Sequence, residues 1–161
     1  MRFLCENHRQ QLLQDEKQVL SHWHEWMRQG DDFLQAEQWA DAFRVLGCSF
    51  EAAEWLVFDC QSSQQDFAHL KHFITAGHRL AGCCRRSGRT DLELHFLLSI
   101  HYRLIDLAKG SAAEYYPLHL NLQESVQRLK QHSHQHGPFE GYQDCLTETD
   151  TYQKNLRRHL H

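Results

Sequence analysis

The sequence predicts an all-α fold of about six or seven helices arranged as antiparallel helical hairpins. Leu (22 residues) outnumbers Val and Ile together (7), and Leu keeps its rotamer freedom in a helix whereas β-branched residues lose it. Only two Pro and eight Gly interrupt the 161 residues, which favours long helices and short turns. Apolar residues recur at every third and fourth position along most of the chain, which is the spacing of one helix face.

Glycines and capping residues divide the first part of the chain. One helix is expected from residue 3 or 11 to residue 29, because Leu, Val and Trp side chains form a stripe there and Gly30 can end it. A second helix is expected over residues 33–46. Asp31 or Asp32 can serve as its N-cap, and Gly47 as its end.

Two further helices are expected on either side of a polar loop. Ser49 is the candidate N-cap of a helix that ends near Cys60, and residues 61–65 form the loop. The clearest helix starts at Asp66 and carries apolar side chains at every third and fourth position. Its last turn holds Arg85 and Arg86, whose charges complement the helix dipole.

Three segments complete the expected fold. Thr90 or Asp91 caps a helix through about residue 108, which is apolar on more than one face and should be deeply buried. Pro117 fits the first turn of the next helix, which Gly137 ends, and the tail from residue 139 forms one helix or two short ones. We expect residues 1–161 to form a single helical domain, with 136–161 as a loosely packed C-terminal segment.

The charge balance excludes the strongly basic surface that nucleic acids and anionic membranes attract. Asp and Glu (21) outnumber Lys and Arg (17), so the net charge is −4 with neutral His. Most of the 14 His, and polar positions along the helices such as Glu93, are expected to be solvated. No apolar run approaches the roughly 20 residues that a membrane-spanning helix needs.

The six cysteines are expected to be free thiols. Five of them lie within helical patterns, where free Cys acts as a small hydrophobic residue. No apolar signal-peptide segment follows Met1. These two features predict a reducing, cytoplasmic location.

Residues 26–46 carry the most informative pattern of the chain. Six positions have the spacing by which a helix pair interlocks large and small side chains: Trp26, Gly30, Phe33, Trp39, Ala42 and Leu46. The segment resembles the tetratricopeptide repeat (TPR) family, although Gln29 and Ser49 depart from the family's preferred Leu and Ala, and a second copy near Leu80 matches poorly. The resemblance implies stacked helical hairpins with a concave groove for peptides or partner proteins, and the other architecture considered is an irregular helical bundle.

These observations predict a protein- or peptide-binding adaptor or chaperone-like module without catalytic activity. The chain has no glycine-rich phosphate-binding loop and no serine-centred nucleophile motif, so we expect no enzyme activity and no cofactor. We expect a protein or peptide partner, no nucleic acid and no membrane, and the sequence leaves the oligomeric state open, a homodimer included. Aromatic and Arg side chains dominate binding interfaces, so the candidate contact residues are Trp23, Trp39, Trp55, Tyr102 and Arg103.

A DNA-binding regulator is the first alternative. Residues 43–56 resemble a helix-turn-helix with Gly47 at the turn and Ser49 capping the recognition helix. That helix carries Glu51 and Glu54 and no basic residue, so phosphates would be repelled.

A metal-binding helical bundle is the second alternative. His132, His134 and His136 form a dense trio in which His132 and His136 share one helical face, and Cys5 and His8 have the spacing of half a zinc site. A redox role was also considered for Cys83 and Cys84. The arginines that follow this pair can lower the pKa of a thiol, and the helix position places Cys83 near the surface and Cys84 in the core.

Overall fold

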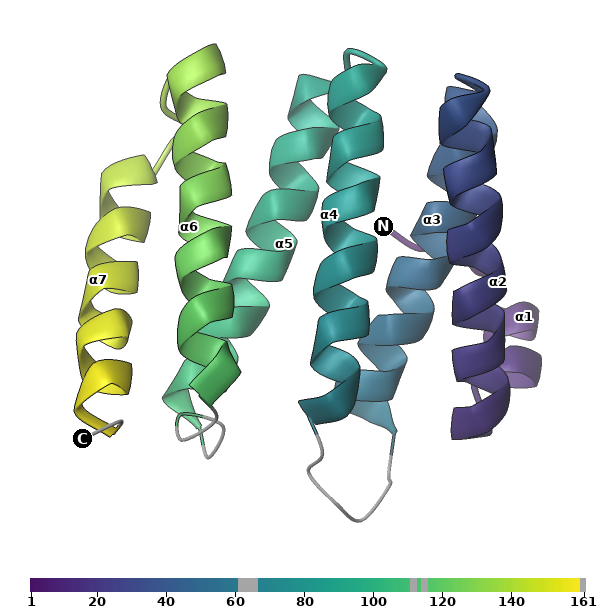
Figure 1. Ribbon diagram of the computed structural model, residues 1–161, viewed down its shortest axis with the longest axis horizontal. Helices are drawn as coiled ribbons and strands as arrows, with labels where there is room; N and C mark the ends of the chain where they lie inside the picture. The colour runs from purple at the N-terminus through teal and green to yellow at the C-terminus, as the bar shows by residue number, and fades with distance from the viewer. Residues whose placement is uncertain (61–66, 111–112, 114–115, 160–161) are drawn as a thin grey trace. The chain divides into compact units, whose positions relative to one another are not determined.

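A computed structural model describes every residue except 61–66, 111–112, 114–115 and 160–161. Within the described residues it holds seven α-helices and no strand, which confirms the all-α prediction (Figure 1). The chain divides into two compact units, Met1–Glu93 and Leu94–His161, and each is considered by itself. No helix in the described part of the chain combines the length and the apolar character that crossing a membrane requires.

Unit 1 is built around an antiparallel hairpin of two long helices, α2 and α3. Asp15 caps the first of them, because its carboxylate accepts a hydrogen bond from the backbone N–H of Gln18 at 3.2 Å. The turn between them contains Glu37, whose φ of 55° lies in the left-handed region. The helices of this unit are α1 (Glu6–Leu12), α2 (Glu16–Gln35), α3 (Trp39–Glu54), α4 (Leu70–Arg86) and the first turn of α5 (Thr90–Lys109).

Gly30 does not end a helix, contrary to the prediction. It lies inside α2, and a Cβ atom built there would stand 2.4 Å from a terminal methyl carbon of Leu46. Leu46 itself is fully buried in α3. The absence of a side chain at Gly30 therefore allows α2 and α3 to pack closely, and the predicted interlock of these two residues is confirmed.

The predicted corner at Gly47 and Ser49 is also wrong, because α3 runs through both residues without interruption. A Cβ at Gly47 would lie 2.0 Å from the ring of Phe3, so glycine here makes room for the N-terminal segment. The Ser49 hydroxyl donates to the carbonyl of Leu46 in its own helix at 2.7 Å instead of capping a new helix. The DNA-binding alternative loses the turn on which it depended.

Glu51 fastens the N-terminal segment to α3. Its carboxylate is 6% exposed and accepts hydrogen bonds from the backbone N–H groups of Phe3 and Leu4, at 2.7 and 2.9 Å. Arg9 of α1 forms an ion pair with the same carboxylate. The DNA-binding alternative assigns Glu51 to a recognition helix, but residues 3–9 contact its carboxylate in the structure.

The end of α3 and the start of α4 differ in part from the prediction. A short π-helix (Trp55–Asp59) continues α3 directly, so the helix expected from Ser49 to Cys60 is the second half of a longer one. The loop predicted at 61–65 and the helix start predicted at Asp66 lie outside the described residues. A 3₁₀ turn (Phe67–His69) leads into α4, whose end at Arg86 agrees with the prediction.

Unit 2 contains the remainder of α5, followed by α6 (Tyr116–His136) and α7 (Tyr142–His159). Pro117 lies in the first turn of α6, and Gly137, with a φ of 88°, follows its end, as predicted. The tail is one helix and not two. Its residues Cys145, Thr149 and Leu156 are buried.

Candidate functional site: an arginine corner and a histidine cluster in unit 1

The last turn of α4 and the loop that follows it carry three arginines within five residues: Arg85, Arg86 and Arg89. Backbone groups already cap this end of α4, since Gly88 N–H donates to the Arg85 carbonyl at 3.1 Å and Arg89 N–H donates to the Cys84 carbonyl at 2.8 Å. Gly88 has a φ of 77°, which this capping turn requires. The arginine side chains are therefore not needed to satisfy the last carbonyls of the helix.

None of these three arginines forms an ion pair with a carboxylate in the described part of the chain, although all three are exposed. Other arginines of unit 1 are paired, for example Arg28 with Glu25 at 2.6 Å and Arg79 with Asp31 at 2.5 Å. The end of α4 therefore presents guanidinium groups that form no ion pair with any carboxylate among the described residues of the unit.

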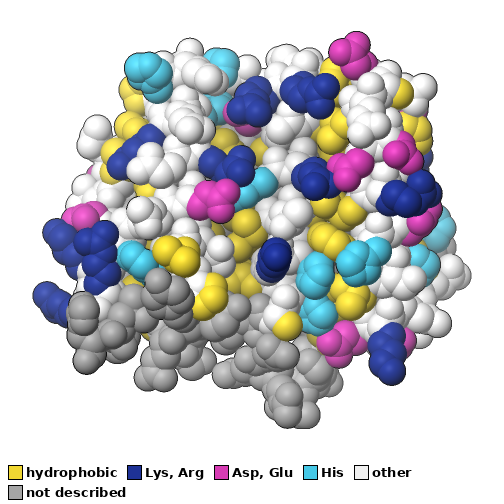
Figure 2. All heavy atoms as spheres, in the orientation of Figure 1, with side chains coloured by type: hydrophobic (Ala, Val, Ile, Leu, Met, Phe, Trp, Pro, Cys, Tyr) yellow, Lys and Arg dark blue, Asp and Glu magenta, His cyan; other side chains and the backbone are white. Residues whose placement is uncertain are grey.

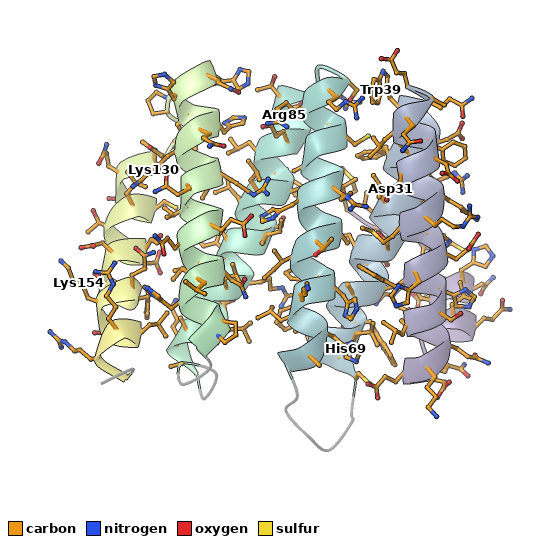
Figure 3. All side chains as sticks on the ribbon, in the orientation of Figure 1. Asp31, Trp39, His69, Arg85, Lys130 and Lys154 are labelled. Atoms are coloured by element: carbon orange, nitrogen blue, oxygen red, sulfur yellow. The ribbon has the colours of Figure 1, made fainter. Side chains whose placement is uncertain are left out.

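Trp39, the first residue of α3, lies beside this turn. The guanidinium carbon of Arg86 stands 4.8 Å from the centre of the Trp39 ring, which is a cation–π contact. The Cys83 thiol also donates to the Trp39 carbonyl at 3.7 Å, which links α3 to α4 at this point. Figure 3 shows Trp39, at the start of α3, and Arg85, near the end of α4, both at the top of the view. We call Trp39, Arg85, Arg86 and Arg89 the arginine corner.

Histidines gather at the other end of α4. His69 Nε2 lies 2.7 Å from a carboxylate oxygen of Glu16, and His69 Nδ1 lies 3.5 Å from His72 Nδ1. The ring of His24 is 5.9 Å from that of His72, between centroids. Figure 2 shows histidine side chains grouped over the lower ends of α2 and α4. We call Glu16, His24, His69 and His72 the histidine cluster.

The environment of the histidine cluster favours neutral imidazole at His72. Burial lowers the pKa of His72, and the nearby His69, His24 and Lys71 lower it further. Trp23 packs edge-on against the His72 ring with 4.5 Å between ring centroids. This contact fixes the orientation of the His72 ring.

A third polar cluster lies in the core of unit 2. His101 is fully buried, with Nδ1 3.0 Å from the Ser125 hydroxyl and Nε2 2.8 Å from the Thr149 hydroxyl. Thr149 donates its own proton to the Cys145 carbonyl at 2.7 Å, so it accepts from His101 Nε2–H, and Ser125 donates to Nδ1. Burial lowers the pKa of His101 to about 4. Ser125 and Thr149 are each 2% exposed, so this neutral histidine joins helices and does not face a substrate.

The five predicted contact residues divide between the two units. In unit 1, Trp39 belongs to the arginine corner, whereas Trp23 is only 7% exposed. Trp55 is partly buried and packs against a cluster of buried core residues that includes Leu4, Val19 and Leu56. In unit 2, Tyr102 is 44% exposed and Arg103 is half-buried. Of the three tryptophans, Trp39 is the one that the structure places beside unpaired arginines.

The vicinal cysteines do not have the environment of a reactive pair. Cys83 and Cys84 are both buried, and burial raises the pKa of Cys83 and raises that of Cys84 to about 12. The core position expected for Cys84 is confirmed, whereas the near-surface position expected for Cys83 is wrong. The pKa of neither thiol is lowered, because the loss of solvation outweighs the favourable charges of Arg86 and Arg89. All six cysteines of the chain are free thiols in the structure.

The histidine trio of α6 is partly buried and partly exposed. His132 is buried, His134 and His136 are exposed, and the rings of His132 and His136 lie 4.8 Å apart. The shared face of His132 and His136 is thus confirmed. The burial of Glu93 contradicts the expectation that this side chain is solvated, and His101 and His132 are the buried histidines among the described residues.

The sequence analysis assigned Arg85 and Arg86 to the helix dipole and singled out neither Arg89 nor the histidine cluster. Three Arg within five residues was an available signal for the corner. The spacing of His69 and His72 was visible, but Glu16 lies 53 positions from His69 and no local pattern joins them.

Comparison with known proteins gives one match. The profile of a family described as "Protein of unknown function (DUF2753)" matches residues 21–160. No curated protein and no solved structure matches the chain. The resemblance to TPR proteins therefore stays a prediction.

Proposed function

The chain belongs to the DUF2753 family, and we propose that it is a protein-binding module of adaptor or chaperone type. In this proposal unit 1 holds an acidic segment of its partner at the arginine corner. The observation that carries the proposal is the set of three exposed arginines that have no carboxylate partner among the described residues, one of which, Arg86, stacks on the Trp39 ring.

The chemistry of the corner suits carboxylates. A guanidinium group presents N–H donors in a planar fork that binds a carboxylate through two parallel hydrogen bonds. Arg86 is already stacked on Trp39, so less side-chain freedom is lost when a ligand binds. Arg and Trp are also the residue types that contribute most to protein interfaces.

The charge of unit 1 favours a short acidic peptide over nucleic acid. Residues 1–93 contain 10 Lys and Arg against 14 Asp and Glu, which gives a net charge of −4. A long polyanion at the corner would meet repulsion from the rest of this unit, whereas a peptide with a few carboxylates would contact only the arginines.

Fluorescence anisotropy with labelled peptides tests the proposal. The probes are a peptide with four Asp or Glu residues interleaved with Leu, and its amide counterpart with Asn and Gln. We expect the acidic peptide to bind and the amide peptide to bind much more weakly. The triple variant Arg85→Gln, Arg86→Gln, Arg89→Gln should lose about 2 kcal/mol, or roughly 30-fold in Kd, because each exposed pair contributes up to about 1 kcal/mol.

A matched variant separates local recognition from overall charge. Lys17→Gln, Arg28→Gln, Arg44→Gln removes three exposed cations elsewhere on unit 1 and should change Kd less than threefold. Equal losses in the two triple variants would contradict the proposal. So would tighter binding of a duplex DNA oligonucleotide than of the acidic peptide at the same salt concentration.

A further inference from the structure

The histidine cluster lies away from the arginine corner. Figure 3 places His69 and Arg85 at opposite ends of α4, whose 17 residues span about 25 Å at 1.5 Å per residue. The role of the cluster is therefore independent of the proposed peptide-binding surface.

Two imidazole nitrogens of the cluster have the separation of metal ligands. His69 Nδ1 and His72 Nδ1 are 3.5 Å apart and face each other one helical turn along the chain. A tetrahedral zinc ion with Zn–N bonds of about 2.0–2.1 Å holds two nitrogen ligands about 3.3 Å apart. As a hydrogen bond between two rings, 3.5 Å lies beyond the usual N–H···acceptor range.

Glu16 prepares His69 as a ligand. The carboxylate oxygen 2.7 Å from Nε2 accepts the ring proton there, which leaves the lone pair of Nδ1 directed at His72. Metal-binding histidines typically donate their other ring N–H to a carboxylate in this manner, which fixes the tautomer and raises the basicity of the ligand nitrogen. The His69 side chain is 13% exposed, so its ring is held while the site stays open to small ions.

His72 is suited to the same role, because its Nδ1 lies 3.5 Å from His69 Nδ1. The contact with Trp23 holds the His72 ring in place. His24, with its ring 5.9 Å away, is the nearest further imidazole.

We propose that His69 Nδ1 and His72 Nδ1 bind a divalent transition-metal ion such as Zn²⁺, with Glu16 orienting His69. Two imidazoles leave the remaining coordination positions to water or to a further ligand. Imidazole nitrogen suits Zn²⁺, Cu²⁺, Ni²⁺ and Co²⁺ and disfavours Mg²⁺ and Ca²⁺, so the site should discriminate between these groups of ions.

Calorimetric titration with Zn²⁺, together with Co²⁺ absorption spectra, tests this site in the tag-free full chain. The titrations use a His132→Ala, His136→Ala background, which removes the histidine pair of α6 as a competing chelate. We expect one equivalent of Zn²⁺ to bind in this background. His69→Ala and His72→Ala should each weaken binding at least tenfold.

Two variants keep the test decisive if a histidine substitution disturbs the fold. Glu16→Gln changes a half-exposed side chain and should weaken Zn²⁺ binding about tenfold, because the ring proton of His69 loses its charged acceptor. His22→Ala, on the same helix with its ring stacked on Trp26, is the matched control and should have no effect.

Two outcomes would overturn the proposal. One is loss of all Zn²⁺ binding in the His132→Ala, His136→Ala background. The other is unchanged binding in Glu16→Gln and in whichever histidine variants fold. The arginine triple variant should bind Zn²⁺ normally, so failure of the peptide proposal and failure of the metal proposal are distinguishable.

Discussion

The buried His101 should make the stability of the protein depend on pH. In the folded protein the pKa of His101 is about 4, whereas an unfolded chain titrates near pH 6.5. Below pH 6.5 the unfolded state therefore binds a proton that the folded state does not bind. The free energy of unfolding should fall by about 1.4 kcal/mol per pH unit from His101 alone, or about 2 kcal/mol between pH 7.5 and 5.0, and the loss should level off below pH 4.

Urea unfolding at pH 7.5 and 5.0, followed by circular dichroism, measures this effect. His101→Gln keeps a side chain that can hydrogen-bond with Ser125 and Thr149 but cannot be protonated. It should be less stable at pH 7.5 and should lose about 2 kcal/mol less than the wild type on acidification. His95→Gln, at an exposed position of the same helix, should keep the wild-type pH dependence. An equal loss in wild type and His101→Gln would refute the assignment of a neutral His101.

Three further predictions concern packing and reactivity. Glu51→Ala should lower the free energy of unfolding by about 3 kcal/mol in urea titrations, because a buried ion pair and two backbone N–H groups lose their acceptor. Gly47→Ala should lower the free energy of unfolding by about 1 kcal/mol, because the clash of the new Cβ with Phe3 outweighs the gain in helix propensity. Gly82→Ala should raise it by about 0.5–1 kcal/mol, because the space at its Cβ is open. The opposite order of melting temperatures would contradict these two predictions. With a thiol reagent at pH 8, exposed Cys5 should react first and Cys5→Ser should remove that fast phase, with half-buried Cys60 reacting next; an equally fast phase left in Cys5→Ser would contradict this order.

Helix ends were predictable where the chemistry of the end is local. Gly137 adopts a positive φ just past the end of α6, and Pro117 occupies the first turn of that helix, so residue type alone indicated these positions. The end of α4 at Arg86 was likewise indicated by the sequence.

Gly30 and Gly47 show why the other boundaries could not be predicted. Both are helix-interior residues that make room for a side chain distant in sequence, Leu46 in one case and Phe3 in the other. A glycine that ends a helix and a glycine that admits a neighbour are identical in a sequence. The real turn carries Glu37 in the left-handed region, a residue type that gives no such signal.

The candidate sites were predictable only in part. Trp39 was expected to contact a partner, and the structure places it beside Arg86. The sequence does not show that backbone N–H groups cap the end of α4, so that the arginine side chains are not needed there. The histidine cluster depends on Glu16 meeting His69 across two helices, which only the packing of α2 near α4 reveals. Burial reversed the expectation for Cys83, because desolvation cannot be judged without neighbours.

The central claim is that an acidic segment binds at the arginine corner, and an NMR titration of ¹⁵N-labelled protein with the acidic peptide tests it most directly. We predict saturable shifts of the Trp39 indole N–H and of the backbone amides around Arg85 and Arg89, with little change near His69. Shifts that are absent, or that are spread over unit 1 without concentrating at Trp39, would contradict the claim.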